Sequence, residues 1–474
     1  MDVDDFEART ATFSSWLKEM GIRTNPKMAL VDLRHEGRGR GVVATEDIKN
    51  DELIFSIPRN AVLNAQNANP LPISRRLSEK MPSWLALTSI LMAEGQVDNS
   101  KWAPYLAILP ERLDSLVFWS DSELAELQAS AVVKKIGKKG AEDMFNSYIA
   151  PLGLKHSSTE MCHKVASVIM AYAFDIPDPS EAPATGGKGG DEDDLISDDG
   201  EDEKTILSMI PLADMLNADA DRNNARLICD NEELEMRAIK PITKGDEIFN
   251  DYGQLPRSDL LRRYGYVTNG YSAYDVAEVS AELIVSMFRN GKVLASLPKL
   301  TQDGLKTRLE LAEREGVYED SFDLVHSSSE EPSIPDELLT FLYLLLIDES
   351  HLKAILDSGS SLPSRSKLTT ELAGQVLVIL LQAKEKEYST TLEEDEVLFK
   401  NANLPVRTAM AIQVRSGEKE VLRAAIQEAT TFSGDNHRMR LAPSKEGTTK
   451  NAKRKGEETE QPKKKVVLGR TSTL

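Results

Sequence analysis

Two short segments of this chain share one pattern although they lie far apart. Residues 48–55 read Ile-Lys-Asn-Asp-Glu-Leu-Ile-Phe, and residues 242–249 read Ile-Thr-Lys-Gly-Asp-Glu-Ile-Phe. In each segment a polar turn precedes an apolar run, which is typical of a strand–turn–strand unit. The recurrence predicts a single β-rich unit, residues 1–270, that is interrupted by a long insertion.

The insertion, about residues 64–205, is predicted to be helical because its apolar residues recur with helical spacing. The clearest segments are residues 84–94, 122–127, 141–149 and 160–174. Residues 6–20 have the same spacing and predict an N-terminal helix. Strands are predicted at residues 41–45, 52–58, 226–229 and 233–239.

Residues 177–204 are rich in Pro, Gly, Asp and Glu and predict a disordered loop inside the first domain. Its acidic part, residues 191–203, suits either a basic protein partner or a loop that only aids solubility. Helical spacing dominates residues 271–440, with the clearest helices at residues 281–288, 335–347, 368–385 and 406–429. We therefore expect an α+β protein: a β-rich domain with a helical insertion, followed by an all-helical domain.

The tail, residues 441–474, has basic clusters at 453–455 and 463–465 and no apolar periodicity. It predicts a disordered arm that serves as a bipartite nuclear import signal, and a merely solvated charged tail is the alternative. We expect a protein of the nucleus, and also of the cytoplasm.

Composition excludes several classes of protein. Two cysteines cannot form a disulfide framework or a zinc site of the Cys-x-x-Cys type, so we expect no metal. The net charge of −20 argues against direct nucleic-acid binding and favours a basic protein partner. The longest apolar run, residues 338–347, is too short to cross a bilayer, and the N-terminal residues lack the pattern of a signal peptide. We expect a soluble monomer that does not associate with membranes.

Residues 37–41, Gly-Arg-Gly-Arg-Gly, let the backbone approach a ligand closely. A dinucleotide-binding loop is excluded because a strand rather than a helix follows, and a Walker loop is excluded because Gly-Lys-Ser/Thr is absent. Two interpretations of this segment remain open. It binds a small zwitterionic cofactor, or it is a glycine-rich hairpin that binds no ligand.

Asn217 ends an apolar run, and Tyr252 lies in an Asp-Tyr-Gly turn after a strand. A buried Asn side chain must satisfy two donors and an acceptor, and an adenine or an amino-acid group can do so. The alternatives are a cap for the turn at Asn217 and a packed core tyrosine at Tyr252.

Together these motifs resemble those of the SET-domain lysine methyltransferases. Gly39-Arg40-Gly41 matches the cofactor loop, Asp214 to Asn217 the Asn-His motif, and Asn250 to Gly253 the catalytic tyrosine motif. Residues 101–105, 170–174 and 261–266 resemble the Rubisco-methyltransferase branch, in particular its fungal enzymes that act on ribosomal proteins. The resemblance covers about residues 26–430.

The resemblance implies transfer of a methyl group from S-adenosyl-L-methionine to a lysine of a basic protein, with Tyr252 as the catalytic residue. It implies cofactor contacts for Gly39, Arg40, Gly41, Tyr172, Asn217, Ala218 and Tyr264, and substrate contacts for Trp102, Ala173 and Asp175. The chain departs from the family at Ala218, where a His is usual. The family contacts adenine here through backbone groups, which alanine also supplies.

A large-subunit ribosomal protein is the substrate that the resemblance favours. A histone or a transcription factor is the alternative substrate. A non-catalytic SET-fold binding module and an acidic interaction protein are alternatives from other functional classes. The lysine that is modified and the number of methyl groups cannot be read from the sequence.

Overall fold

The computed structural model describes residues 3–36, 38–68, 81–179, 205–230, 232–327, 332–358 and 362–440. Most of the predicted acidic loop, residues 180–204, and the predicted basic tail, residues 441–474, lie outside the described residues. The described part is a mixed helix and strand structure, as the sequence predicts.

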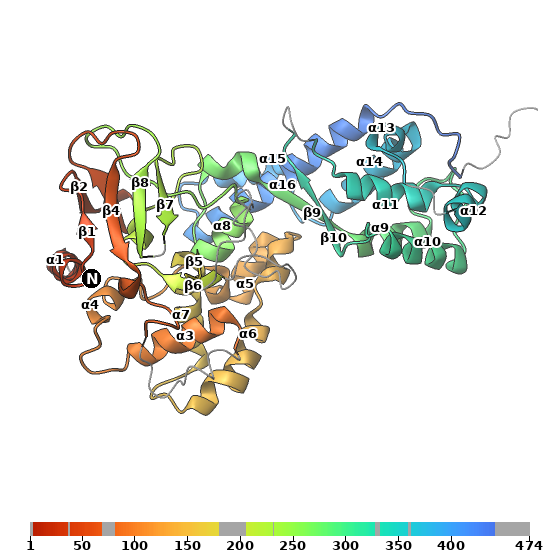
Figure 1. The fold of residues 1–474 in the computed structure, drawn as a ribbon. Coiled ribbons are helices and arrows are strands. Elements are labelled where there is room, and N and C mark those ends of the chain that lie inside the picture. Colours follow the sequence, from red (N-terminus) through yellow and green to blue (C-terminus); the bar gives the residue numbers. More distant parts are fainter. Residues whose placement is uncertain are drawn as a thin grey trace, which may run out of the picture.

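The N-terminal half is built on antiparallel strands (Figure 1). A four-stranded sheet has the order β1-β4-β8-β7, and β2 pairs separately with β3. Side chains of β8 alternate between buried and half-buried positions, because successive residues of a strand point to opposite faces. The elements are helix α1 (Val3–Glu19) and strands β1 (Arg23–Thr24), β2 (Met28–Asp32), β3 (Arg40–Ala44), β4 (Leu53–Pro58), β7 (Ala225–Cys229) and β8 (Glu233–Ala238).

The two similar segments lie side by side. Ile48 and Ile242 each donate a backbone N–H to the carbonyl of the other at 2.9 Å, and the Ala44 N–H donates to the Asp246 carbonyl at 2.9 Å. One β unit is therefore formed from both ends of the first domain. The prediction of a β-rich domain interrupted by a helical insertion is confirmed.

The insertion between β4 and β7 is mainly helical. It contains α3 (Ser83–Glu94), α4 (Ala103–Leu106), α5 (Asp121–Leu124), α6 (Lys138–Met144), a π-helical turn (Phe145–Ile149) and α7 (Thr159–Tyr172), followed by strands β5 (Ala173–Pro177) and β6 (Thr205–Met209). The predicted extension of the last helix to residue 174 is wrong, because Ala173 is already extended, with ψ 153°, and pairs with Met209.

The C-terminal part is helical apart from one antiparallel pair of strands, β9 and β10, so the prediction that it contains only helices is wrong in this detail. Each strand is five residues long with buried and half-exposed positions, a signal too short to stand out among helices. The elements are α8 (Arg257–Tyr264), β9 (Val276–Ser280), α9 (Ala281–Asn290), α10 (Gln302–Arg314), β10 (Ser321–Val325), α11 (Asp336–Leu346), α12 (Glu349–Ser358), α13 (Arg365–Leu368), α14 (Glu371–Glu385), α15 (Leu392–Phe399) and α16 (Val406–Thr430).

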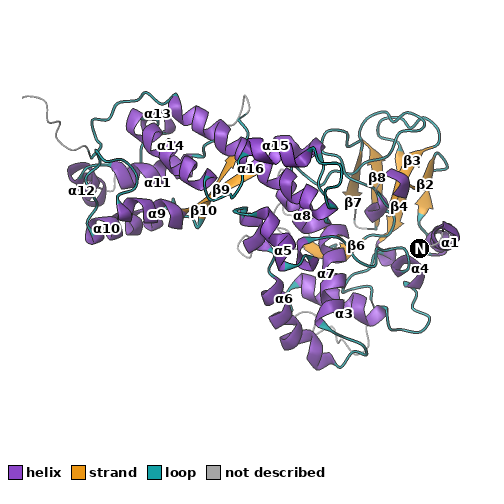
Figure 2. Ribbon diagram, turned by 180° about the vertical axis from the view of Figure 1, so that it is seen from behind, coloured by secondary structure: helices purple, strands orange, loops and turns teal. Residues whose placement is uncertain are grey.

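The molecule has two main hydrophobic cores, one of residues between Phe13 and Ile248 and one of residues between Ala277 and Met439. Helix α16 connects the two regions. Its C-terminal half packs in the second core, whereas Ala411 and Val414 pack with Leu116, Trp119 and other residues of the insertion. Figure 2 shows the two regions meeting around α8, α15 and α16.

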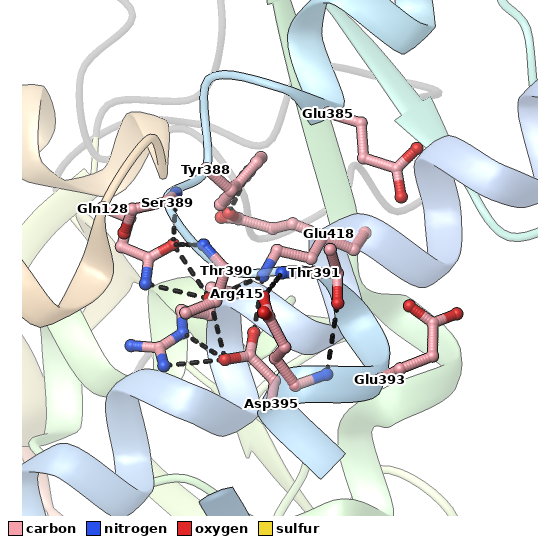
Figure 3. Close-up of polar contacts among 12 residues, drawn as sticks. Gln128, Glu385, Tyr388, Ser389, Thr390, Thr391, Glu393, Asp395, Arg415 and Glu418 are labelled. Carbon is pink, nitrogen blue, oxygen red and sulfur yellow. Dashed lines mark hydrogen bonds and ion pairs between the residues drawn. The ribbon is translucent and has the colours of Figure 1, made fainter. Parts of the chain in front are cut away.

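A buried polar network secures this junction (Figure 3). Asp395 on α15 accepts hydrogen bonds from Arg415 at 2.7 Å and from Lys419 at 2.5 Å, both on α16. Arg415 also donates to the backbone carbonyl of Glu126 in the insertion. Gln128 accepts a hydrogen bond from the Ser389 N–H at 3.0 Å. Since Asp395 and Lys419 are fully buried, their charges are balanced within the network rather than by solvent.

Candidate active site

A cavity of about 280 Å³ lies where several segments of the chain meet. It is bounded by the start of α1, the segment after β2 through the start of β3, the loop after α4, and the region of Asn217 and Tyr252. The lining includes Phe6, Arg9, Arg34, Gly39, Arg40, residues 107–111, Tyr172, residues 214–217 and Tyr252. Sequence motifs that are far apart in the chain therefore form one cavity.

Tyr252 stands at the wall of this cavity in the loop that precedes α8. Its hydroxyl donates to the Leu216 carbonyl at 3.2 Å, and its ring stacks on Tyr264 with centroids 4.8 Å apart. Burial, together with the neighbouring Tyr264, raises the pKa of Tyr252 well above its usual value. The hydroxyl is thus neutral at physiological pH, and it is fixed in direction by the stacked ring.

Asn217 braces the cofactor loop that the resemblance implies. Its side-chain amide donates to the Arg40 carbonyl at 3.3 Å and to Glu247 Oε1 at 2.7 Å. Glu247 also forms an ion pair with Arg38. The backbone carbonyl of Asn217 accepts from the Asn250 N–H at 2.9 Å, and Ala218 pairs with Asn250 as a parallel bridge. The chain around Asn217 thus lies directly beside the segment that leads to Tyr252.

The two glycines of the loop have different surroundings. A Cβ at Gly41 would lie 2.4 Å from Leu33 Cδ1 and 2.8 Å from Glu247 Oε1, so any larger residue there would have to displace these side chains. A Cβ at Gly39 would meet nothing within 4 Å. Gly39 lines the cavity, whereas Gly41 lies behind it against Asn217 and Glu247.

Asp214 and Tyr105 belong to the site but are absent from the predicted site residues. The Tyr105 hydroxyl donates to Asp214 Oδ2, and within the described residues Oδ1 has no hydrogen-bond partner. Asp214 lines the cavity and is 3% exposed, and burial raises its pKa to about 8. Its position inside the apolar run 210–216 is the signal that identifies it, since a carboxyl group in such a run needs a specific reason to be there.

Tyr172 is at the cavity, at the last position of α7. Burial, with a further contribution from Asp214, raises the pKa of its hydroxyl to about 12. Leu212, which precedes the turn bearing Asp214, has φ +78°, a conformation that is costly for a leucine. This strained turn aims Asp214 toward Tyr105.

The remaining predicted site residues lie behind or beside the cavity. Gly41, Ala218 and Tyr264 support it from behind. Ala173 and the exposed Asp175 lie on β5, directly after Tyr172, and their contact with a substrate stays a prediction. Trp102 is fully buried beside Trp16, with ring centroids 6.0 Å apart. This burial argues against the predicted contact between the Trp102 side chain and a substrate, and assigns the residue to the core.

Two features are absent from the residues that the structure describes. No group of three or more His, Cys, Asp and Glu side chains there is arranged to hold a metal ion. No helix in that part of the chain is long and apolar enough to span a membrane.

Two protein families match the chain. The SET domain matches residues 39–253, and the Rubisco LSMT substrate-binding domain matches residues 300–422. Both matches are consistent with the division of the two main cores.

Individual relatives agree with these matches. The ribosomal lysine N-methyltransferase 4 of Saccharomyces cerevisiae is 37% identical over 305 residues, which are 60% of this chain and 61% of the yeast protein. The N-lysine methyltransferase SETD6 of Bos taurus is 27% identical over 463 residues, 90% of this chain and 96% of that protein. The mouse actin-histidine N-methyltransferase is 26% identical over 87% of this chain and 67% of its own length.

A solved structure has the same fold. The SET domain of LSMT bound to lysine and AdoHcy superposes with a TM-score of 0.65 at 21% identity, covering 89% of this chain and 91% of that one. Known proteins therefore match both the SET domain and the Rubisco LSMT substrate-binding domain of this chain. The chain belongs to the SET-domain lysine methyltransferases that carry a Rubisco LSMT substrate-binding domain, a family whose methyl donor is S-adenosyl-L-methionine.

Proposed function

We propose that this protein methylates a lysine of a basic protein, and that its substrate is a large-subunit ribosomal protein. The observation that carries the methyl-transfer assignment is the neutral, oriented Tyr252 hydroxyl in one cavity with Gly39, Asn217 and Tyr172. The ribosomal substrate is supported by the name of the yeast relative, which is 37% identical to this chain.

The residues at the cavity fit the cofactor. Gly39 leaves open space beside the loop backbone, and Tyr172 and Tyr252 provide neutral aromatic walls. When bound, S-adenosyl-L-methionine supplies an electrophilic methyl group. Gly39 and Arg40 would hold its amino-acid end through backbone groups, and Asn217, which lines the cavity, would hold the adenine, with Ala218 supporting it from behind.

The protein must also provide a neutral lysine amine, because an ammonium group has no free electron pair. Enclosure among aromatic rings lowers the pKa of a lysine, since burial disfavours the charged form. The Tyr252 hydroxyl already donates its proton to the Leu216 carbonyl, so its oxygen lone pairs remain to accept an N–H of the amine. Fixed orientation of this kind can contribute about 7–11 kcal/mol to lowering a barrier.

The charge of the chain is consistent with a basic substrate. The net charge is −20, and attraction between opposite charges accelerates the encounter of two proteins. We also propose that the protein is a monomer, which sedimentation equilibrium tests directly.

The assignment is tested by incubating the purified protein with radiolabelled S-adenosyl-L-methionine and separated ribosomal proteins, histones and actin. We expect label on one large-subunit protein, on a lysine located by mass spectrometry. Label on histone lysine alone would replace the ribosomal substrate. Label on histidine, the residue modified by the actin enzyme that is 26% identical, would replace the lysine assignment.

Tyr252→Phe separates catalysis from binding. This variant keeps the stacked ring and removes the hydroxyl, so turnover falls by about 100-fold or more, while calorimetric cofactor affinity stays near that of the wild type. Near-normal turnover in the variant contradicts the role of Tyr252. Absence of cofactor binding in the wild type favours a non-catalytic binding module.

The basic clusters at residues 453–455 and 463–465 lead us to propose nuclear import. A fluorescent fusion should collect in the nucleus, and replacement of both clusters by alanine should abolish this accumulation. Equal distribution of the two fusions would favour a solvated tail with no targeting role.

A further inference from the structure

Helix α1 contributes to the cavity although it lies outside the matched SET domain, which begins at residue 39. Phe6 and Arg9, on its first turns, line the cavity together with Gly39 and Arg40. The helix lies next to α4 at the edge of the first domain (Figure 2). An element that the family match does not include therefore forms part of the cofactor cavity.

The Phe6 ring is in contact with two arginines. The guanidinium carbons of Arg34 and Arg40 lie 3.8 Å and 3.9 Å from its centroid. Both groups are therefore within cation–π distance of one ring. Phe6 is only 6% exposed, so these cation–π contacts are largely shielded from water, where they are stronger than at an exposed site.

The polar atoms of Arg40 are taken up in the same region. Its Nε donates to Thr10 Oγ1 at 3.0 Å, Nη2 to the Phe6 carbonyl at 3.4 Å, and Nη1 to the Ile108 carbonyl at 3.0 Å. The Arg40 side chain thus reaches α1 and the loop after α4. Its own carbonyl accepts from Asn217 on the other side.

A second contact joins α1 to the same loop. Arg9 Nη1 donates to the Ala107 carbonyl at 3.3 Å, next to the Ile108 carbonyl that Arg40 uses. Phe6, Thr10 and Arg9 therefore connect β3 with the loop after α4. Both of these segments border the cavity.

We propose that α1 is a positioning element for the cofactor loop, with Phe6 and Thr10 as positioning residues that hold Arg40. The proposal rests on the function proposed above. A loop with glycines at 39 and 41 loses much conformational freedom when it becomes ordered around a ligand. Contacts that order the loop beforehand remove that cost from binding, so α1 strengthens cofactor affinity without touching the reacting atoms.

The test compares Phe6→Ala with Leu17→Ala in the full-length protein. Both replace a buried apolar residue of α1, and Leu17 is 3% exposed in the first core, away from the cavity. We expect Phe6→Ala to weaken S-adenosyl-L-methionine binding by about tenfold in calorimetry and to raise the KM for the cofactor by a similar factor. Leu17→Ala should lower the unfolding temperature and leave the affinity of the folded protein unchanged.

Hydrogen exchange provides a readout that needs no cofactor. The amides of residues 38–41 should exchange faster in Phe6→Ala than in the wild type or in Leu17→Ala. Thr10→Val should increase the exchange of these amides in the same way as Phe6→Ala, but by less. Thr10→Ser should exchange like the wild type because it keeps the hydroxyl that accepts from Arg40.

Unchanged affinity and unchanged exchange in Phe6→Ala would overturn the proposal. Equal weakening of affinity by Phe6→Ala and Leu17→Ala would also overturn it, because α1 would then act only through overall stability. Failure of the wild type to bind cofactor concerns the proposed function instead, and the exchange comparison still tests whether α1 orders the loop.

Discussion

Among single residues, Asp214 has the most unusual environment. It is a carboxylic acid with one partner, Tyr105, and its pKa is raised to about 8 by burial. At neutral pH the folded protein therefore keeps a proton on this group. A neutral Asp214 can stand at the cavity wall without the cost of a buried unpaired charge.

This proton makes stability depend on pH. An unfolded Asp has a pKa of about 3.9, so between about pH 4 and pH 8 the folded state binds more protons at this site. The contribution of Asp214 to the free energy of unfolding thus decreases as pH rises through this window, by up to about 1.4 kcal/mol per pH unit, and is constant above it. Urea unfolding from about pH 6 to pH 8 should give a flatter profile for Asp214→Asn than for the wild type. If the free energy of unfolding changes with pH in the same way in both proteins, the result contradicts the raised pKa of Asp214.

The paired glycines allow a matched comparison. Gly41→Ala places a Cβ 2.4 Å from Leu33 Cδ1 and should lower the free energy of unfolding by about 1–3 kcal/mol, the usual cost of overpacking. The Cβ added by Gly39→Ala meets nothing within 4 Å, so this variant should unfold like the wild type. Chemical denaturation of both variants checks the expectation. Equal loss of stability would mean that Gly39 is as tightly enclosed as Gly41.

The sequence identifies site residues whose type is unusual for their position. Tyr252 and Asn217 interrupt the local pattern, and both line the cavity. Trp102 suggests substrate recognition from the sequence because it is an aromatic residue near a motif. Its burial depends on contacts with α1 that no local pattern encodes. Asp214 stands out as a carboxylate inside the apolar run 210–216, but the sequence does not show its hydrogen bond with Tyr105, which is distant in the chain.

Among elements, long amphipathic helices and the two matching β segments are predicted well. Strand β5 is not, because helical spacing continues through residues 173–174 and only pairing with β6 makes the chain extended. Strands β9 and β10 pair across two intervening helices, α9 and α10, and the sequence gives no sign of that partner. Local propensity thus predicts elements that stabilise themselves and misses those that depend on a remote partner.

Helices α15 and α16 are held together by Asp395. Asp395→Asn leaves Arg415 and Lys419 buried without their carboxylate, and removing one member of a buried ionic group typically costs about 3–5 kcal/mol. Glu393 on the same helix pairs with Arg423 but is 66% exposed, so Glu393→Gln should have little effect on stability. Urea denaturation distinguishes the two variants. If Asp395→Asn leaves the free energy of unfolding unchanged, the network does not secure the junction.

For the whole molecule, the decisive contact is the close passage of α16 over the first domain. A Cβ at Gly417 would lie 1.9 Å from Asp275 Oδ2 and 2.3 Å from Arg257 Nη2, two residues that form a buried ion pair. Next to Gly417, Glu418 accepts from the Ser130 hydroxyl at 2.6 Å. The two regions of the molecule are thus in contact through buried, hydrogen-bonded side chains.

Gly417→Ala should therefore separate α16 from the first domain. We expect a lower unfolding temperature and lower methylation of a folded protein substrate, because the two domains no longer keep a fixed relation. Glu420→Ala changes an exposed residue of the same helix and serves as the control. Calorimetry and the labelling assay provide both measurements. Wild-type behaviour of Gly417→Ala would show that the helix accommodates the methyl group by a small displacement.

The position of α16 in the chain has a consequence for biosynthesis. Residues 406–430 leave the ribosome later than Leu116, Trp119 and Leu261, yet they complete the packing of these upstream residues. Until then these apolar side chains have no cover from α16. A chain that stops before residue 406 therefore lacks the junction, so the junction forms only after residues 406–430 have been translated.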